Sequence, residues 1–262
     1  MKRMFAIFVG IVFAALCQLA LAAPAVVSSL TGTAQAIPGA GAPRTLRIGD
    51  DVNQGETVAT GDNSSIVLRF EDGQIVALAG RSRMVVNAYT YNRTEPARSN
   101  VLLSLLDGGM RAITGLIGRA DRTKVAYRAG NATIGIRGTD VTIATSGGAV
   151  GVTVADGEIT FTFNGQTVSI PVGDGARTLP NGQIQIASAA QIIAAIVAQN
   201  PALGAILQSV NSTTLQNAVR DAVQQSRTPP PPPGATGTPP PPGTTGAGAG
   251  TGGAGGGGTS TR

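Results

Sequence analysis

Residues 150–172 read VGVTVADGEITFTFNGQTVSIPV, and this stretch decides the fold class. Apolar side chains alternate with small or polar ones in three runs, which are separated by Asp156-Gly157 and Asn164-Gly165. A period of two places each apolar set on one face of a strand, and Asp-Gly and Asn-Gly are preferred in tight turns between antiparallel strands. The stretch therefore predicts three consecutive antiparallel β-strands.

The same pattern extends outward from this stretch over about residues 25–186. Short runs rich in Val, Ile and Thr end at Gly, Asn or Asp, and Ile66, Leu68 and Phe70 form one such alternating set. Many short strands at this spacing are typical of a sandwich, a barrel or a solenoid of hairpins, and the sequence does not choose among them. We predict an all-β domain of many short antiparallel strands over residues 23–187.

The apolar period changes from two to about 3.6 after this domain. Asn200-Pro201 and Ser212-Thr213 have the form of helix caps, so we predict two or three short helices over residues 188–226. We expect their apolar faces to pack on the β domain, with docking to a partner helix or a membrane surface as the alternative. The positions that form the apolar stripe are Ile192, Ile196, Leu203, Leu207, Val210, Leu215, Val219 and Val223.

The two ends of the chain have compositions of their own. Residues 1–22 combine Lys2 and Arg3 with an apolar run and the small residues of Ala20-Leu21-Ala22, which is the layout of a cleavable secretory signal peptide. Residues 227–262 are rich in Pro, Gly and Thr and predict a disordered tail. We therefore expect an exported protein, in the periplasm or alternatively at the cell surface or outside the cell, without a transmembrane segment after cleavage.

Composition argues against catalysis. The sequence has no histidine and one cysteine, which lies in the predicted signal peptide, and Lys124 is the sole lysine of residues 23–262. Serine and cysteine triads cannot be assembled from these residues, and the usual zinc and redox-metal ligands are missing. We predict no enzyme activity, no cofactor and no metal.

Paired carboxylates are the remaining enzymatic alternative, because glycoside hydrolysis needs only two of them. Asp51 and Glu71 are the candidates for such a hydrolase. Glycine-rich residues 115–118 and 135–138 lack the lysine of a phosphate-binding loop and are interpreted as strand bulges. The acidic residues that directly precede a glycine are interpreted as turn residues, and they are Asp72, Asp107, Asp156 and Asp174.

The middle of the chain is basic. Residues 81–137 hold ten Arg and Lys residues against three acidic ones. Such a segment can bind an anion, and Arg119, Arg122 and Lys124 are the candidate anion-binding residues, with acidic polysaccharide as the candidate ligand. The simpler interpretation is a solvated surface. Nucleic acid is not an expected partner of an exported protein.

Three segments together resemble the FecR domain family. They are residues 49–61 (GDDVNQGETVATG), residues 109–118 (GMRAITGLIG) and residues 132–140 (ATIGIRGTD), and the resemblance covers roughly residues 28–180. The third segment resembles the family's Arg-Gly-Thr motif. Its candidate residues, either structural or partner-facing, are Gly135, Ile136, Arg137, Gly138 and Thr139. For Arg137 we expect a structural role in which it stabilises a bulge through Asp140 or an acidic turn.

The resemblance carries an expectation about function. The best-known members of the family are inner-membrane regulators that receive a signal from a siderophore transporter and control a sigma factor. Such regulators need a cytoplasmic region and a spanning helix before the domain, whereas here the predicted signal peptide leads directly into it. We therefore expect a binding or scaffolding module of the bacterial cell envelope whose partners are envelope proteins. A periplasmic sensor related to siderophore-type signalling, and a binder of anionic glycans, are the alternatives.

Overall fold

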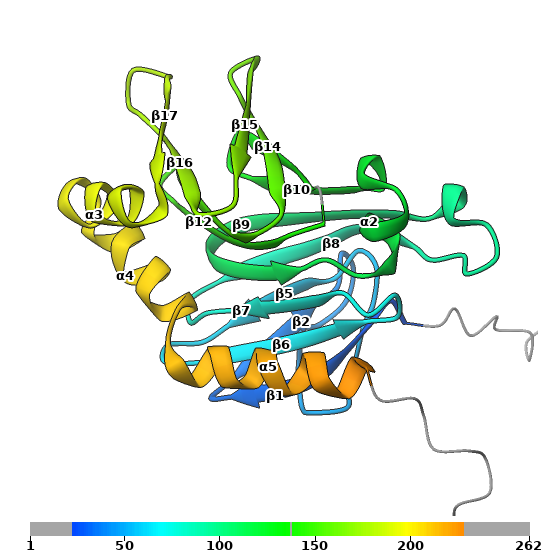
Figure 1. Cartoon of the computed structure of the whole chain (residues 1–262). Coiled ribbons are helices and arrows are strands. Elements are labelled where there is room, and N and C mark those ends of the chain that lie inside the picture. Colours follow the sequence, from blue (N-terminus) through cyan, green and yellow to red (C-terminus); the bar gives the residue numbers. More distant parts are fainter. Residues whose placement is uncertain (1–22, 137, 228–262) are drawn as a thin grey trace, which may run out of the picture. The chain divides into compact units, whose positions relative to one another are not determined.

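The computed structural model describes residues 23–136 and 138–227 (Figure 1). The predicted signal peptide and, beyond Arg227, the predicted tail lie outside the described residues. The strands are β1 (Ala25–Thr31), β2 (Ala34–Ile37), β3 (Arg44–Thr45), β4 (Asp51–Val52), β5 (Thr57–Thr60), β6 (Ser65–Phe70), β7 (Ile75–Leu78), β8 (Arg83–Thr90), β9 (Asn100–Ile113), β10 (Val125–Ala129), β11 (Ala132–Ile136), β12 (Asp140–Ser146), β13 (Ala149–Asp156), β14 (Glu158–Phe163), β15 (Gln166–Pro171), β16 (Asp174–Thr178) and β17 (Ile184–Ser188). The helices are η1 (Pro96–Arg98), α2 (Leu116–Ala120), η2 (Arg122–Lys124), α3 (Ala189–Gln199), α4 (Pro201–Val210) and α5 (Thr213–Arg227).

The strands form two sheets that share one strand. Sheet A has the order β4-β1-β6-β7-β9-β12-β13-β16-β17. Sheet B has the order β3-β2-β5-β8-β9-β10-β11-β14-β15. After β9 the chain alternates between them in hairpins, with β10 and β11 in sheet B, β12 and β13 in sheet A, β14 and β15 in sheet B, and β16 and β17 in sheet A. The all-β prediction is confirmed.

Strand β9 joins the two sheets. Its first half pairs with β8 and β10 in sheet B, and its second half, from Gly108, pairs with β7 and β12 in sheet A. The pairing of β9 with β10 is parallel, because α2 and η2 carry the chain across between them, whereas the other strand pairs of the described residues are antiparallel. The prediction of short antiparallel strands therefore misses the length of β9 and this one parallel pair.

The hydrophobic core lies between the sheets. Alternating residues such as Ile66 and Leu68 of sheet A, and Ile159 and Phe161 of sheet B, belong to one buried cluster. Two sheets that bury their facing sides against each other form a sandwich. Residues 150–172 form the three predicted antiparallel strands, β13, β14 and β15. Asn164-Gly165 forms the turn between β14 and β15, with both residues at positive φ.

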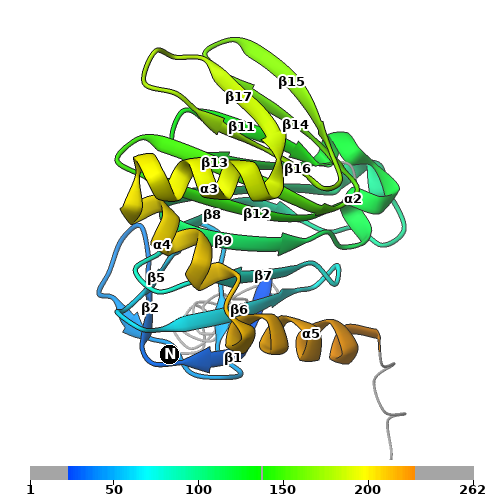
Figure 2. The ribbon, with the colours of Figure 1, turned by 60° about the vertical axis from the view of Figure 1, so that its left-hand side comes forward.

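The three C-terminal helices cover the outer face of sheet A. Figure 2 shows α3, α4 and α5 in front of its strands, from β16 to β1, and the expected packing on the β domain is confirmed. Asn200 accepts a hydrogen bond from Leu203 N (3.1 Å) and Ser212 accepts one from Leu215 N (3.4 Å), so both predicted caps are present. Within the described part of the chain, no helix has the length and hydrophobicity that a membrane span requires.

Glycines allow the helices to approach the sheet closely. A Cβ at Gly109 would lie 2.4 Å from Val210 Cγ2 and 2.7 Å from Ile206 Cγ2 of α4. A Cβ at Gly151 would lie 2.4 Å from Ile196 Cδ1 of α3. A side chain at either position would therefore force Val210 and Ile206, or the end of Ile196, to move.

Three local predictions are wrong. Residues 115–118 do not form a strand bulge, because Gly115 is the N-cap of α2. Asp107 and Asp174 lie within β9 and β16 rather than in hairpin turns. In the second case the turn precedes the predicted dipeptide by one residue, at Gly173, which has a φ of 86°.

Candidate functional site

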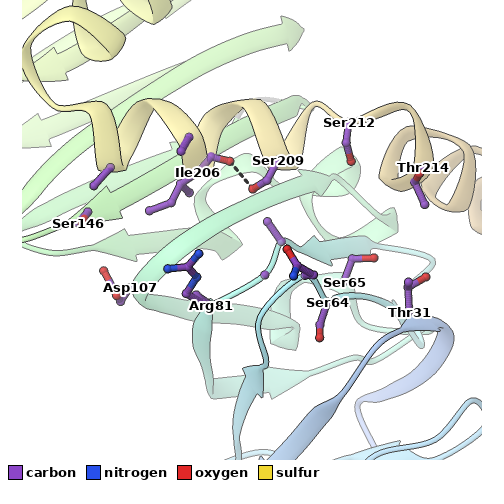
Figure 3. A pocket seen from close by; sticks show the side chains of 15 residues that line it. Thr31, Ser64, Ser65, Arg81, Asp107, Ser146, Ile206, Ser209, Ser212 and Thr214 are labelled. Atoms are coloured by element: carbon purple, nitrogen blue, oxygen red, sulfur yellow. Dashed lines mark hydrogen bonds between the residues drawn. The ribbon is translucent and has the colours of Figure 1, made fainter.

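A polar groove runs alongside α4 and the start of α5 and has a volume of about 600 Å³ (Figure 3). We call it the α4 groove. Its opposite wall consists of strand ends, turns and the middle of β9, which carry Thr31, Asn63–Ser65, Ala79–Arg81, Asp107 and Ser146. Figure 3 shows the labelled side chains in a row, from Ser146 and Asp107 at one end to Thr31 and Thr214 at the other. The groove is therefore elongated along the helices.

Two turns of this wall have unusual backbone conformations. Asn63 has a φ of 50° and Arg81 a φ of 54°, both in the left-handed region that side chains other than glycine rarely adopt. Arg81 N donates a hydrogen bond to Gly61 O (3.1 Å), which ties the two turns together. The Arg81 guanidinium also pairs with Asp62 (3.1 Å), and both side chains are largely exposed. Asparagine adopts this region readily in turns, as Asn164 also does, whereas for an arginine it is uncommon.

The polar groups of the α4 groove fall into two sets. Ser64, Ser209 and Ser212 are engaged in local hydrogen bonds, in which Ser64 accepts from Thr33 N (2.9 Å) and Ser209 donates to Ile206 O (2.7 Å). The second set consists of side chains that make no hydrogen bond or ion pair to another described residue. Its members are Thr31, Asn63, Ser65, Asp107, Ser146 and Thr214. The groove therefore offers free donors and acceptors.

The Gly135–Thr139 segment leads from sheet B to sheet A. Gly135 and Ile136 end β11, and Ile136 is buried in the core. Gly138 has a φ of 70°, and its carbonyl oxygen would lie 2.2 Å from a Cβ at Gly157. Arg137 lies outside the described residues. The segment thus makes a close backbone crossing beside the β13–β14 junction.

Buried hydrogen bonds hold the end of this segment. Thr139 N donates to Thr114 Oγ1 (2.9 Å), and Thr114 Oγ1 donates to Thr139 O (3.0 Å). Next to them, the Arg111 guanidinium forms a bidentate ion pair with Asp140 at 2.8 and 2.6 Å. The two side chains are 16% and 17% exposed. Asp140, expected as a partner of Arg137, is thus paired with Arg111 of the neighbouring strand.

Asp72 is a buried anchor that sequence reasoning assigned only to a turn. It does lie in the β6–β7 turn, but it is 1% exposed, and it accepts hydrogen bonds from Gln74 N (3.1 Å), Ile117 N (3.2 Å) and the Tyr89 hydroxyl (3.2 Å). The Tyr127 hydroxyl donates to Gln74 Oε1 (3.0 Å). Burial raises the pKa of Asp72, and burial raises the pKa of both tyrosines. Tyr89 and Tyr127 lie 17 and 55 residues after Asp72, and no local pattern of the sequence connects the three.

The predicted anion-binding residues lie together on one short segment. Arg119 belongs to α2, and Arg122 and Lys124 belong to η2. The two arginines are exposed and Lys124 is half-buried, and none of the three has an ion pair with a described residue. Leu116, at the start of α2, is 54% exposed beside them. None of these residues lines the α4 groove.

The hydrolase alternative gains no support from the geometry. Asp51 and Glu71 are exposed and do not line the α4 groove. No aromatic side chain lines the groove, and Phe70, Tyr127 and Phe161 are fully buried between the sheets. Within residues 23–136 and 138–227, no group of acidic, histidine or cysteine side chains is arranged to hold a metal ion.

Comparison with protein families places these observations in context. Residues 56–160, from the start of β5 into β14, match the family described as FecR protein. Residues 56–160 form a FecR domain. The domain contains Asp72, the Arg111–Asp140 pair and the Gly135–Thr139 segment. The match is narrower than the 28–180 expected from sequence, and β15, β16, β17 and helices α3 to α5 lie outside it.

Two crystal structures of a proposed anti-sigma factor from Parabacteroides distasonis are similar to this FecR-domain chain. The structure at 1.65 Å has a TM-score of 0.41 at 14% identity, over 50% of this chain and 59% of the other. The structure at 2.50 Å has a TM-score of 0.42 at 13% identity, over 55% and 64%. The chain thus spans about three fifths of the length of these relatives. No curated protein matches it.

Proposed function

We propose that this chain is a non-enzymatic binding or scaffolding module of the bacterial cell envelope that acts through contacts with other proteins. Export to the periplasm is part of the proposal and is supported by the signal-peptide pattern of residues 1–22. The double sheet, of which residues 56–160 form the FecR domain, supplies the scaffold on which contact surfaces are held.

The observation that carries the proposal is the distribution of polar groups. Apart from Gln74 Nε2, which has no hydrogen-bond partner, the buried polar side chains of the described residues are used internally, as Asp72 is with Tyr89 and as Arg111 is with Asp140. The unpaired polar side chains of the α4 groove line an open surface, and none of them is a buried titratable group. Catalysis needs a positioned acid, base or nucleophile with a tuned pKa, whereas binding needs free hydrogen-bonding groups on a rigid surface. The arrangement matches the second requirement.

The proposal is tested by capture of partners from envelope extracts. Residues 23–262 contain one lysine and no cysteine, so a biotin is placed on a single engineered cysteine and amine-reactive crosslinkers are avoided. We expect one or a few envelope proteins to be retained and to be displaced by an excess of the free chain. If the excess of unlabelled chain displaces no envelope protein from the biotinylated chain, the proposal is contradicted.

A second candidate function, the binding of acidic polysaccharide, is favoured by one specific observation. Arg119, Arg122 and Lys124 lie on one short segment, form no ion pair with a described residue and outnumber Asp121 between them, so a net positive charge is available to an external anion. We expect retention on a heparin column that weakens with salt and is lost when all three become Ala. The matched control is the double variant of Arg69 and Arg83, two exposed arginines elsewhere. Equal loss in the control would show a nonspecific charge effect and would overturn this candidate.

A further inference from the structure

We propose that the α4 groove is the protein-binding site of this module and that it takes an extended segment of a partner, with a Lys or Arg of that segment at Asp107. The inference rests on the proposed function and names its contact site. The expected occupant is a peptide, and a saccharide found in the groove would contradict the inference.

The free groups of the groove match a polypeptide backbone. A hydroxyl or a carboxamide both donates and accepts hydrogen bonds, as each peptide unit does. Thr31, Ser65, Ser146 and Thr214 are such hydroxyls, and none of them has a side-chain partner among the described residues. They follow the long direction of the groove (Figure 3). An extended chain can therefore pair with them in succession.

The charges of the groove indicate a basic residue in the partner. Arg81 is already paired with Asp62, at 3.1 Å. Asp107 is exposed and has no ion pair or hydrogen bond from its side chain to a described residue. Arg83 stands opposite Asp107 in the β8–β9 register, but no ion pair joins the two side chains. Asp107 is thus the charged groove residue without an ion pair, and it lies at the end next to Ser146 (Figure 3). A Lys or Arg of the segment would complement it.

Size and apolar surface favour a peptide over a sugar ring. The volume of about 600 Å³ is in the range of small-ligand sites. Ala202, Ala205 and Ile206 form an aliphatic strip on α4, which suits a small apolar side chain. No aromatic side chain lines the groove, and stacking on an aromatic ring is what a sugar face would use. The α4 wall is fixed, because Ile206 and Val210 pack onto Gly109 of β9.

Site-directed photocrosslinking tests the inference. Residues 23–262 lack cysteine, so one cysteine introduced by Ala205→Cys can carry a benzophenone into the groove. The matched control is Gln208→Cys, which is exposed on the same helix but does not line the groove. Both labelled chains are irradiated in envelope extract, and the attached segment is identified by mass spectrometry. We expect one partner segment to be attached from position 205 and to be absent from position 208.

The segment is then synthesised as a peptide and its Kd is measured by fluorescence anisotropy against the whole chain. We expect Ala205→Phe, which fills the groove, to weaken binding at least tenfold. We expect Asp107→Asn to weaken it about fivefold, with the loss confined to low salt. Asp51→Asn, which changes an exposed acid that neither lines the groove nor pairs with a groove residue, is expected to leave Kd within twofold. Equal urea midpoints for all variants show that they are folded.

The outcomes separate this inference from the proposed function. If partners are captured but Ala205→Phe and Asp107→Asn leave peptide binding unchanged, the groove is the wrong site and the proposed function stands. If the benzophenone at position 205 attaches only to glycan, the peptide occupant is overturned. If no partner is captured by any form of the chain, the proposed function fails first.

Discussion

The ion pair between Arg111 and Asp140 gives the sharpest test of how this fold is held together. It joins β9 to β12, directly after the Gly135–Thr139 segment, through two hydrogen bonds of 2.8 and 2.6 Å. Asp140→Asn keeps the shape of the side chain and removes its charge. Arg111→Met keeps most of the aliphatic stem and removes the guanidinium.

The expected cost follows from the burial of the pair. Both side chains are about five-sixths buried, with exposed fractions of 16% and 17%. Removal of one partner of a buried pair costs roughly 3–5 kcal/mol, because the other charge is left without compensation, and the residual exposure lowers the expected value to about 2–3 kcal/mol. For a domain of this size that loss corresponds to a decrease in Tm of about 5–10 °C. The double variant should lose little more than either single variant.

Urea unfolding followed by circular dichroism measures the free energy of unfolding of the four proteins. We expect a coupling energy of about 2 kcal/mol from the double-mutant cycle. Arg98→Gln is the control, since its ion pair with Glu95 is mostly exposed at 73% and 53%, and it should cost less than about 0.5 kcal/mol. Losses from the two single variants that add within about 0.5 kcal/mol would refute the reasoning.

Three further predictions concern other parts of the sandwich. Gly157→Ala should lower the free energy of unfolding in urea by about 2–3 kcal/mol, because its Cβ would lie 2.2 Å from the carbonyl oxygen of Gly138. The control Gly147→Ala is also at positive φ but in open space, and it should cost about 1 kcal/mol. Equal losses from the two variants would contradict this. Burial raises the folded-state pKa of Asp72, so its contribution to stability is full below about pH 4 and is lost as the pH rises through the folded pKa. The stability difference between wild type and Asp72→Asn should therefore shrink from pH 4 to pH 7, and a difference that grows would overturn the assignment. Arg177→Met should speed hydrogen exchange in α3, because this buried arginine donates to acceptors at the C-terminal end of that helix, and unchanged exchange in α3 would show that the helix is held by apolar contacts alone.

Local patterns predict the parts of this fold that depend on near neighbours. The alternation of Ile66, Leu68 and Phe70 identifies a strand because one face of it is buried. Asn164-Gly165 identifies a hairpin because both residues adopt positive φ. Asn200 and Ser212 identify helix starts because each cap hydrogen bond joins residues only three positions apart.

Features that depend on distant residues escaped prediction. Asp72 has the local signature of a turn, and only the approach of Ile117 and Tyr89 makes it a buried anchor. Asp107-Gly108 also has that signature, but pairing with β7, β8, β10 and β12 extends the strand through it. The α4 groove combines residues that are up to 183 positions apart in sequence, from Thr31 to Thr214. No spacing rule along the chain connects such residues.

The strand shared by both sheets has a mechanical consequence. The hydrogen bonds of β9 hold sheet B along its first half and sheet A along its second half, so a load that pulls the sheets apart acts along one continuous backbone. Neither sheet can lose β9 without leaving the other with an open seam. We therefore expect the sandwich to yield in a single step when stretched, and single-molecule extension with two separate unfolding steps for the sheets would contradict this. A module anchored between envelope components would then act as one mechanical unit.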